Sequence, residues 1–484
     1  MSRTIKQPSL LDALIPVIVL ISMLAGTVAV FGLDSFGPNQ VALIMAAAVA
    51  AMIGIKNGHS WNEIEQGMID TISVSLQSIL ILLMVGALIG SWILSGTVPS
   101  MIYYGVELMS PDYFYLTACL VCALLGFSIG SSWTVAGTLG IGLMGIAAAL
   151  NLSLPISAGA IISGAYFGDK LSPLSETTNL AAAVTSNNLF NHIQHMLWTT
   201  IPAFIITLVL FFVMGIGSNS NLVITDIEVL QAAMQDTFTI NIFMLAPLAL
   251  LLIMAVKKLP ALSTLICGTV AGCLFAAVFQ WDVVIALAAD SSLSAGAAVF
   301  KGLFSAMFLG YNSITGNEAL DTLLSKGGMS NMLMTVGLVV NAMAFGGAMR
   351  ITGLLERLVE AALRRAKSTG DLIVATVGTC IGTNVLAADQ YLSLVIPGQM
   401  FVKSYENHDL STLNLARTLE DSGTLTSALV PWNTCGAYMS ATLGVSTFMY
   451  APFAFFNILC PIIAIIYGYA SIGIAKSELQ LAKG

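Results

Sequence analysis

The stretch that decides the fold reads Ser-Gly-Ala-Tyr-Phe-Gly-Asp-Lys-Leu-Ser-Pro-Leu-Ser-Glu-Thr-Thr-Asn-Leu-Ala over residues 163–181. Apolar sequence flanks it, but its middle carries Asp169, Lys170 and Glu176. Pro173 removes a backbone donor there and prevents a regular helix. Inside a bilayer, irregular backbone is tolerated only where it faces protein or a water-filled cavity, and an unpaired charge costs about 2.5–3.5 kcal/mol. The stretch therefore predicts a broken membrane helix around a polar site.

The composition of the whole chain also indicates a membrane environment. Of 484 residues, 57% are hydrophobic and 9% are charged, whereas soluble domains carry about 25% charged residues. This low charge excludes a soluble enzyme, a disordered protein and a nucleic-acid-binding protein, because a surface in water needs more charge. The net charge of −8 is spread without an acidic or basic tail. We therefore predict an all-α polytopic membrane protein.

Apolar runs of about 20 residues, the length that spans a bilayer as a helix, recur along the chain. The uninterrupted runs are 11–33, 39–55, 72–96, 196–216, 239–256, 260–280, 331–349 and 450–473. Three further runs, at 113–150, 155–190 and 371–447, are apolar but broken by Gly, Pro and polar residues. The uninterrupted runs predict plain spans, and paired broken runs are typical of the binding site of a transporter.

Lys and Arg residues, which mark cytoplasmic loops, set the predicted orientation. The residues used are Arg3, Lys6, Lys56, Lys257, Lys258, Arg350, Arg357, Arg364, Arg365, Lys367, Lys476 and Lys483. They place both termini in the cytoplasm. The other runs fit this orientation only if 113–150 is a hairpin entered from outside and 371–401 is one entered from inside. The predicted tips of these re-entrant hairpins are 130–134 and 382–384.

Each hairpin is followed by a broken span of opposite direction, which we interpret as one unit used twice in inverted orientation. The predicted organisation is 1–112 for the N-terminal helices and the start of repeat 1, 113–190 for transport unit 1, 191–330 for connecting and scaffold helices, 331–370 for the start of repeat 2, 371–447 for transport unit 2 and 448–484 for the C-terminal helix. Sequence identity between the halves is weak, and shifts of 252 and 245 positions align different residues.

The broken spans and hairpin tips supply oxygen-bearing side chains where an apolar helix would otherwise continue. The ion-binding and proton-coupling candidates are Asp169, Ser172, Ser175, Glu176, Thr177, Thr178, Asn179, Asp389, Glu420 and Asp421, and the hairpin-tip candidates are Ser131, Ser132, Thr134, Thr383 and Asn384. Oxygen ligands suit hard cations. A desolvated carboxylate also takes up protons more readily. One such group can therefore bind either ion, and this competition is the minimal chemistry of antiport.

Lys170 and Arg417 allow two other interpretations. In the first, Lys170 with Asp169 and Arg417 with Glu420 form structural ion pairs that hold unwound backbone. In the second, both cations and the hairpin tips bind an organic anion. A membrane enzyme with haem or quinone chemistry is disfavoured, because the chain has four histidines and none lies in the middle of a predicted span.

These motifs resemble those of the NhaC family of sodium/proton antiporters. The resemblance rests on residues 163–181, Gly-Ser-Ser-Trp-Thr at 130–134, Gly-Thr-Asn-Val-Leu-Ala-Ala-Asp-Gln-Tyr at 382–391, Glu-Asp-Ser-Gly-Thr-Leu at 420–425 and Val-Pro-Trp-Asn-Thr-Cys-Gly at 430–436. It implies sodium/proton exchange in a bacterial inner membrane, an elevator-like transport domain with paired hairpins, and a homodimer formed by a scaffold domain. One branch of the family resembles malate/lactate exchangers coupled to sodium and protons.

We therefore predict a secondary active Na⁺/H⁺ antiporter that works by alternating access. Na⁺ is expected at Asp169, Glu176 and Asp421, with protons competing for the same carboxylates. The alternative is a Na⁺/H⁺-coupled dicarboxylate exchanger of the malate/lactate type. No enzyme activity, cofactor or nucleic-acid partner is expected. The expected partners are Na⁺, protons, the lipid bilayer and a second copy of the chain.

Overall fold

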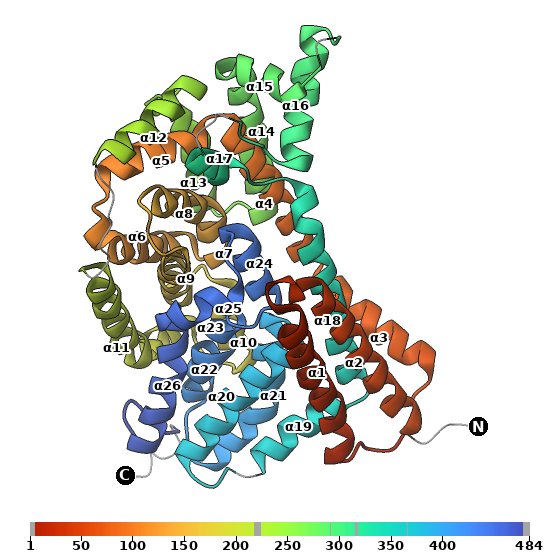
Figure 1. Ribbon diagram of the computed structural model, residues 1–484. Coiled ribbons are helices and arrows are strands. Elements are labelled where there is room, and N and C mark those ends of the chain that lie inside the picture. The colour runs from red at the N-terminus through yellow and green to blue at the C-terminus, as the bar shows by residue number, and fades with distance from the viewer. Residues whose placement is uncertain (1–4, 217–223, 291, 315–317, 365, 478–484) are drawn as a thin grey trace.

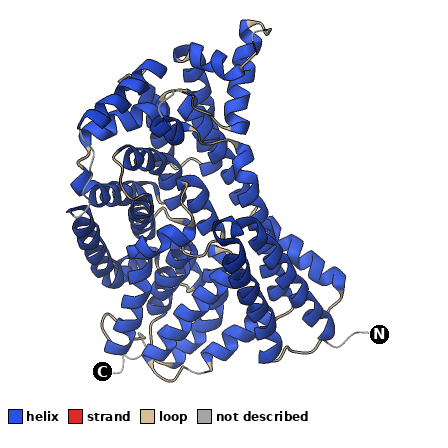
Figure 2. Ribbon diagram, in the orientation of Figure 1, coloured by secondary structure: helices blue, strands red, loops and turns tan. Residues whose placement is uncertain are grey.

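The computed structural model describes residues 5–216, 224–290, 292–314, 318–364 and 366–477. Within this part of the chain every regular element is helical (Figure 2), apart from an isolated bridge between Leu410 and Lys476. Among the described residues, nine helices are long and apolar enough to cross a membrane, or up to eleven if each bent pair is one span. The predicted all-α polytopic class is confirmed. Arg3, Arg365 and Lys483, used for the predicted orientation, lie outside the described residues.

Each plain span predicted from hydropathy contains a helix. The elements are α1 (Leu10–Phe31), α2 (Phe36–Lys56), α4 (Leu76–Leu94), α11 (Leu189–Ile216), α13 (Ala246–Val256), α14 (Ala261–Phe279), α18 (Met329–Ile351) and α26 (Phe455–Ala470). A further helix, α3 (Trp61–Val74), begins with a capping box at Ser60 and precedes α4. Because α18 packs along α2, α3 and α4 (Figure 1), helices from both halves of the chain form one bundle.

The segment between α11 and α18 is more helical than its sequence predicts. It contains α12 (Ile224–Thr237), a 3-10 turn (Ile242–Leu245), α15 (Trp281–Ala288), α16 (Ala295–Leu309) and α17 (Glu318–Leu324). α15 and α16 pack against each other, and α16 also packs on α4. Hydropathy missed α16 because its 15 residues are fewer than the about 20 that span a bilayer.

The first hairpin turns where the sequence predicts. Its elements are the preceding α5 (Thr97–Leu108), then α6 (Phe114–Ile129), α7 (Ser132–Val135), a π-helical turn (Ala136–Gly140) and α8 (Ile141–Ala149). α6 ends at Gly130, whose φ of +73° is a conformation that glycine adopts without a steric cost. Ser131 then caps α7 by accepting a hydrogen bond from the Thr134 backbone N–H at 3.2 Å.

The first broken span consists of α9 (Leu154–Leu171) and α10 (Glu176–Val184). The gap between the two helices contains Pro173, as its missing backbone donor predicts. Asp169 and Lys170 lie in the last turn of α9, and Glu176 is the first residue of α10. α9 packs along α6, so the break lies beside the tip of the first hairpin.

The second hairpin turns later than predicted. Its elements are the preceding α19 (Leu354–Leu363), then α20 (Thr369–Leu386) and α21 (Gln390–Asn407). The predicted tip at 382–384 is wrong, because these residues continue α20 and Thr383 Oγ1 donates to the Thr379 carbonyl one turn earlier, at 2.9 Å. The chain turns at Ala387–Asp389 instead. Ala388 has a φ of +56°, and Asp389 caps α21 by accepting from Leu392 N at 2.9 Å.

The second broken span is interrupted after its carboxylates. Its elements are α22 (Thr412–Leu419), a π-helical turn (Glu420–Thr424), α23 (Leu425–Ser427) and α24 (Thr434–Leu443), followed by α25 (Thr447–Tyr450). Arg417, Glu420 and Asp421 therefore belong to helical backbone. The break contains Pro431 and ends at Asn433, which caps α24 by accepting from Cys435 N at 3.0 Å.

The helix caps give the register between the two halves. The N-caps Ser110 and Ser368, Ser131 and Asp389, Ser153 and Ser411, and Ser175 and Asn433 are each 258 positions apart. The shifts of 252 and 245 considered from the sequence are wrong for these units. The register was hidden because Ser, Asp and Asn replace one another as N-caps, so the repeated feature is the position at which a helix begins and not a residue type.

Candidate functional site

A cavity of about 300 Å³ lies where the two hairpins and the two broken spans meet. The hairpins and broken spans supply the polar lining residues Ser131, Ser132, Thr134, Asp169, Ser175, Glu176, Thr177, Gln390, Tyr391, Thr434 and Cys435, and α4 and α14 add Gln77, Ser78 and Thr264. α4 and the loop between α13 and α14, with Lys258, contribute to the rest of the wall. Segments that are far apart in the sequence thus surround one polar space.

Asp169 is the buried carboxylate of this cavity, with 6% of the residue exposed. Its Oδ2 accepts a hydrogen bond from the Ser132 backbone N–H at 3.0 Å. Gly130, at the hairpin tip, lies so close to the break that a Cβ there would come within 2.7 Å of the Leu174 carbonyl carbon. The first hairpin therefore fixes the Asp169 carboxylate at the cavity wall.

Several predicted ligands bond to the backbone of the first break. The bonds run from Leu174 N to Ser172 Oγ (3.2 Å), from Thr178 N to Ser175 Oγ (3.4 Å), from Thr178 Oγ1 to Lys170 O (3.0 Å) and from Asn179 Nδ2 to Pro173 O (3.0 Å). They satisfy donors and acceptors that the interrupted helix leaves without a partner. Ser172, Thr178 and Asn179 thus support the break, while Ser175 and Thr177 also line the cavity.

Glu176 faces the cavity from the start of α10 and meets the second hairpin there. The Tyr391 hydroxyl donates to Glu176 Oε2 at 2.6 Å. Sequence reasoning missed the cavity residues of the second half, which are Gln390, Tyr391, Thr434 and Cys435. They directly follow the N-caps Asp389 and Asn433. The first residues of these helices face the cavity, so an N-cap residue in the sequence would have predicted that the two residues after it line the site.

The residues predicted at the second tip support the site from behind. Asn384 Nδ2 donates to Gly423 O at 2.7 Å and to Thr426 Oγ1 at 3.0 Å, which ties α20 to the second broken span. Asp389 is 3% exposed and is used as a helix cap. Thr383, Asn384 and Asp389 are not among the described residues that line the cavity.

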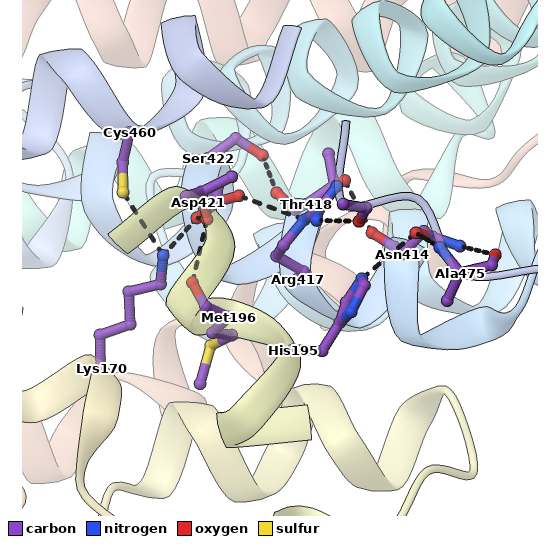
Figure 3. A network of polar contacts seen from close by, with 12 residues as sticks. Lys170, His195, Met196, Asn414, Arg417, Thr418, Asp421, Ser422, Cys460 and Ala475 are labelled. Carbon is purple, nitrogen blue, oxygen red and sulfur yellow. Dashed lines mark hydrogen bonds and ion pairs between the residues drawn. The ribbon is translucent and has the colours of Figure 1, made fainter. Parts of the chain in front are cut away.

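Lys170, the neighbour of Asp169, belongs to a second polar cluster (Figure 3). Its ammonium forms an ion pair with Asp421 Oδ1, and both side chains are 0% exposed. The ammonium also lies 3.5 Å from Cys460 Sγ, and Thr199 Oγ1 donates to Asp421 Oδ1 at 2.9 Å. Lys170 therefore forms an ion pair as one interpretation expected, but its partner is Asp421 of the other broken span and not Asp169.

Arg417 is fully buried and contacts the C-terminal segment Gly473–Lys476. Its Nη1 donates to the Gly473 carbonyl at 2.6 Å, and its Nε lies 4.0 Å from Asp421 Oδ2. Asn414 exchanges two hydrogen bonds with the Ala475 backbone, at 2.6 and 3.0 Å. Arg417 thus directs its charge to Asp421 and not to Glu420, and the C-terminal segment holds α22 in place (Figure 3).

Glu420 also lies in this cluster. Its side chain is 0% exposed, yet neither carboxyl oxygen has a hydrogen-bond partner among the described residues. The buried cations Lys170 and Arg417 are both directed to Asp421. An ionised carboxylate buried in this way costs several kcal/mol, whereas a neutral carboxyl group avoids most of that cost. Glu420 is thus placed to hold a proton.

The three carboxylates at which Na⁺ is expected from the sequence are divided between these two places. Asp169 and Glu176 line the cavity, whereas Asp421 lies outside its lining and pairs with Lys170. In the part of the chain that the structure describes, no group of three or more His, Cys, Asp or Glu side chains is placed to hold a metal ion. The three carboxylates therefore do not surround one space, because the helix continues past Asp421 and only breaks at Ala428–Asn433.

Known proteins resemble this chain over most of its length. A family model described as "Na+/H+ antiporter family" matches residues 164–472. The Na(+)/H(+) antiporter NhaC of Alkalihalophilus pseudofirmus is 37% identical over 91% of this chain and 92% of that protein. The malate-2H(+)/Na(+)-lactate antiporter of Bacillus subtilis is 35% identical over 95% of both. The arginine/ornithine antiporter ArcD of Halobacterium salinarum is 35% identical over 96% of this chain and 92% of that protein.

Proposed function

The chain belongs to the Na⁺/H⁺ antiporter family, and we propose that it exchanges Na⁺ for protons as a secondary active transporter of a bacterial inner membrane. The observation that carries this proposal is the polar cavity, in which Asp169 and Glu176 lie among hydroxyl groups from both halves of the chain. Carboxylate and hydroxyl oxygens are the ligands that a hard cation prefers. The proposed cycle needs no cofactor and no catalytic step.

The proposed Na⁺ site lies between the first hairpin tip and the first break. Asp169 and Glu176 would supply the negative charge, and Ser131, Ser132 and Thr177 hydroxyls are available in the same lining. The Tyr391 hydroxyl now donates its hydrogen to Glu176. When a cation binds there, the hydroxyl would have to turn away or offer its oxygen instead, because its hydrogen carries partial positive charge and repels the cation. Na⁺ binding is thereby linked to the contact between the two halves.

The orientation and the repeat are part of the proposal. Lys6 N donates to Asn57 O at 2.9 Å, and Lys56 pairs with Asp12 at 2.7 Å, so the basic residues before α1 and at the end of α2 lie together. This supports a common cytoplasmic side for them, with the C-terminus proposed on the same side. The shared 258-residue spacing of N-caps supports two equivalent transport units, which we propose to be inverted relative to each other.

An elevator-like movement and a homodimer are also proposed. Glycines line the contact between the hairpin units and the other helices: Gly142 and Gly145 on α8 lie against Met101 and Ile102 of α5, and Gly346 on α18 lies against Ala387. Contacts made by glycine permit close approach of backbones with little side-chain interlocking. Gly346→Val is expected to lower the exchange rate, because a Cβ at 346 would come within 2.7 Å of the Ala387 Cα. The mass of the detergent-solubilised protein tests the dimer.

A second candidate is exchange of a small organic acid together with Na⁺ and protons. α10, α21 and α24 all begin at the cavity, and helix N-termini carry partial positive charge that favours a carboxylate. Lys258 adds a positive charge at the cavity wall. The names of two relatives, a malate-2H(+)/Na(+)-lactate antiporter and an arginine/ornithine antiporter, show that related chains carry organic substrates.

Na⁺-driven proton movement in proteoliposomes free of organic anions separates the two candidates. Na⁺/H⁺ antiport predicts that added Na⁺ moves protons at some pH between about 6 and 9, and that Asp169→Asn abolishes the signal while Asp282→Asn, outside the cavity lining, preserves it. Exchange that appears only after malate, lactate or an amino acid is added establishes the second candidate. No proton movement under either condition rejects both.

A further inference from the structure

The starting observation is the contrast between two adjacent carboxylates in the π-helical turn. Asp421 forms an ion pair with Lys170, accepts a hydrogen bond from the Thr199 hydroxyl and lies 4.0 Å from Arg417 Nε. Glu420 is equally buried, but both of its carboxyl oxygens lack a hydrogen-bond partner among the described residues. The positive charges of Lys170 and Arg417 are thus both directed to the Asp421 carboxylate. The Glu420 carboxyl group can therefore take up a different positive charge.

The other groups around Glu420 do not supply the positive charge that its carboxylate would need. The charges that act on Glu420 are those of Lys170, Asp169 and Asp421, and the Thr424 side chain lies beside its carboxyl group. Further titratable or charged groups on the neighbouring elements include Glu176, His192, Cys380, Tyr405, Arg417 and Cys460. Among the described residues, no group of three or more His, Cys, Asp or Glu side chains here is arranged to hold a metal ion. A proton needs no such group of ligands, so it is the positive charge that the Glu420 carboxyl group can take up by itself.

Glu420 is linked to the cavity through α9. Asp169 and Lys170 are neighbours on that helix, and Asp169 faces the cavity while Lys170 faces the buried cluster. Glu420 interacts electrostatically with both of them. A negative charge on Glu420 therefore strengthens cation binding at Asp169, and a neutral Glu420 weakens it, because Coulomb interactions act across short distances in a region of low dielectric constant.

We propose that Glu420 carries the exchanged proton, and that it does so outside the cavity that binds Na⁺. The inference rests on the proposed Na⁺/H⁺ exchange and replaces competition at one carboxylate by coupling between two sites. When Na⁺ enters the cavity, the Glu420 carboxyl group loses its proton to water and becomes a carboxylate. When the proton returns, the carboxylate is neutralised and Na⁺ leaves. The charge of the bound Na⁺ replaces the charge of the released proton.

Infrared difference spectroscopy tests the location of the proton without any transport. Purified protein in Na⁺-free buffer near neutral pH should show the C=O stretching band of a protonated carboxyl group, and Na⁺ should remove it. The band should shift when glutamate alone is ¹³C-labelled, and it should be missing from Glu420→Gln. Asp169→Asn is the matched control and should keep the band. A wild-type protein without the band, or a band that survives Glu420→Gln, overturns the proposal.

The pH dependence of Na⁺ binding tests the coupling. In the wild-type protein the Na⁺ dissociation constant should fall as pH rises, by about fivefold or more, the usual range for coupled sites. Glu420→Gln imitates the protonated state, so its affinity should stay at the weak, low-pH value of the wild type at every pH. A Glu420→Gln protein that keeps the wild-type pH dependence overturns the proposal. If this variant does not fold, the ¹³C-shifted glutamate band is measured in Glu176→Gln instead: the proposal expects the band to remain, and its loss there places the proton in the cavity and overturns the proposal.

These measurements also separate this inference from the proposed function. A glutamate band that is present without any Na⁺-driven proton movement rejects the exchange but keeps the proton on Glu420. Exchange that proceeds normally in Glu420→Gln keeps the proposed function and rejects Glu420 as the proton carrier.

Discussion

Lys170 on α9 and Asp421 in the π-helical turn, 251 positions apart in the sequence, form an ion pair in which both side chains are fully buried. The pair joins the first broken span to the second. Its neighbours Asp169 and Glu420 face different surroundings, the cavity on one side and the buried polar cluster on the other. The ion pair therefore marks the boundary between the proposed Na⁺ site and the proposed proton site.

Removal of either partner of this pair should destabilise the protein strongly. Lys170→Gln or Asp421→Asn leaves one buried charge without its partner, which costs about 3–5 kcal/mol. The double variant leaves neither charge, so its loss of stability should be smaller than the sum of the single losses. Equilibrium unfolding in detergent measures this. Lys301→Gln is the control, because Lys301 and Asp290 form an exposed pair worth about 1 kcal/mol or less. Additive single effects would contradict the assigned pair.

The two hairpins should respond differently to an added methyl group. Gly130→Ala places a Cβ within 2.7 Å of the Leu174 carbonyl carbon in a backbone conformation with φ of +73°, so it should displace Asp169 and lower exchange at least about tenfold, the effect of about 1.4 kcal/mol. Gly382→Ala has no atom within 4 Å of its new Cβ and should be neutral or stabilising by up to about 1 kcal/mol. Proteoliposome exchange rates and thermal midpoints check both. Loss of exchange in Gly382→Ala would restore 382–384 as a tip.

Tyr391→Phe should alter Na⁺ affinity while leaving the fold intact. The variant removes the hydroxyl that donates to Glu176 at 2.6 Å, so a cation no longer has to displace this donor. We expect the KM for Na⁺ to fall up to about tenfold, since a hydrogen bond to a charged group contributes about 1.5–3 kcal/mol and part of this is recovered from solvent. Tyr113→Phe, outside the cavity lining, is the control. A higher KM in Tyr391→Phe would instead assign the hydroxyl oxygen as a Na⁺ ligand.

Asn414→Ala should weaken the attachment of the C-terminal segment. It removes two hydrogen bonds with the Ala475 backbone, at 2.6 and 3.0 Å. Loss of buried bonds of this kind costs about 1–3 kcal/mol. Faster hydrogen exchange at residues 473–477 and a lower thermal midpoint are the expected results. Asn191→Ala, an exposed position, should change neither. Unchanged hydrogen exchange at residues 473–477 would show that Arg417 and the backbone bridge between Leu410 and Lys476 hold the segment without Asn414.

Much of the fold was predictable because its signals are local. Hydropathy located the plain spans, and Pro173, together with Asp169 and Glu176, located the first break. Predictions failed where two local signals compete. The sequence of residues 382–384 predicts a turn, but the Thr383 hydroxyl donates to a backbone carbonyl within a helix. Asp389 is the stronger N-cap, and the chain therefore turns after these residues.

The candidate site was predictable in its parts and not in its grouping. The sequence by itself determined that the chain is a polytopic helical membrane protein, that its few carboxylates away from loops belong to broken spans, and that it resembles sodium/proton antiporters, because hydrophobicity, helix breaking and motifs are properties of short segments. Only the tertiary structure decided that Lys170 pairs with Asp421, that Tyr391 meets Glu176, and that the Glu420 oxygens have no hydrogen-bond partner among the described residues. The physical reason is that a buried charge is balanced by whichever group packs beside it, and here that group comes from the other half of the chain.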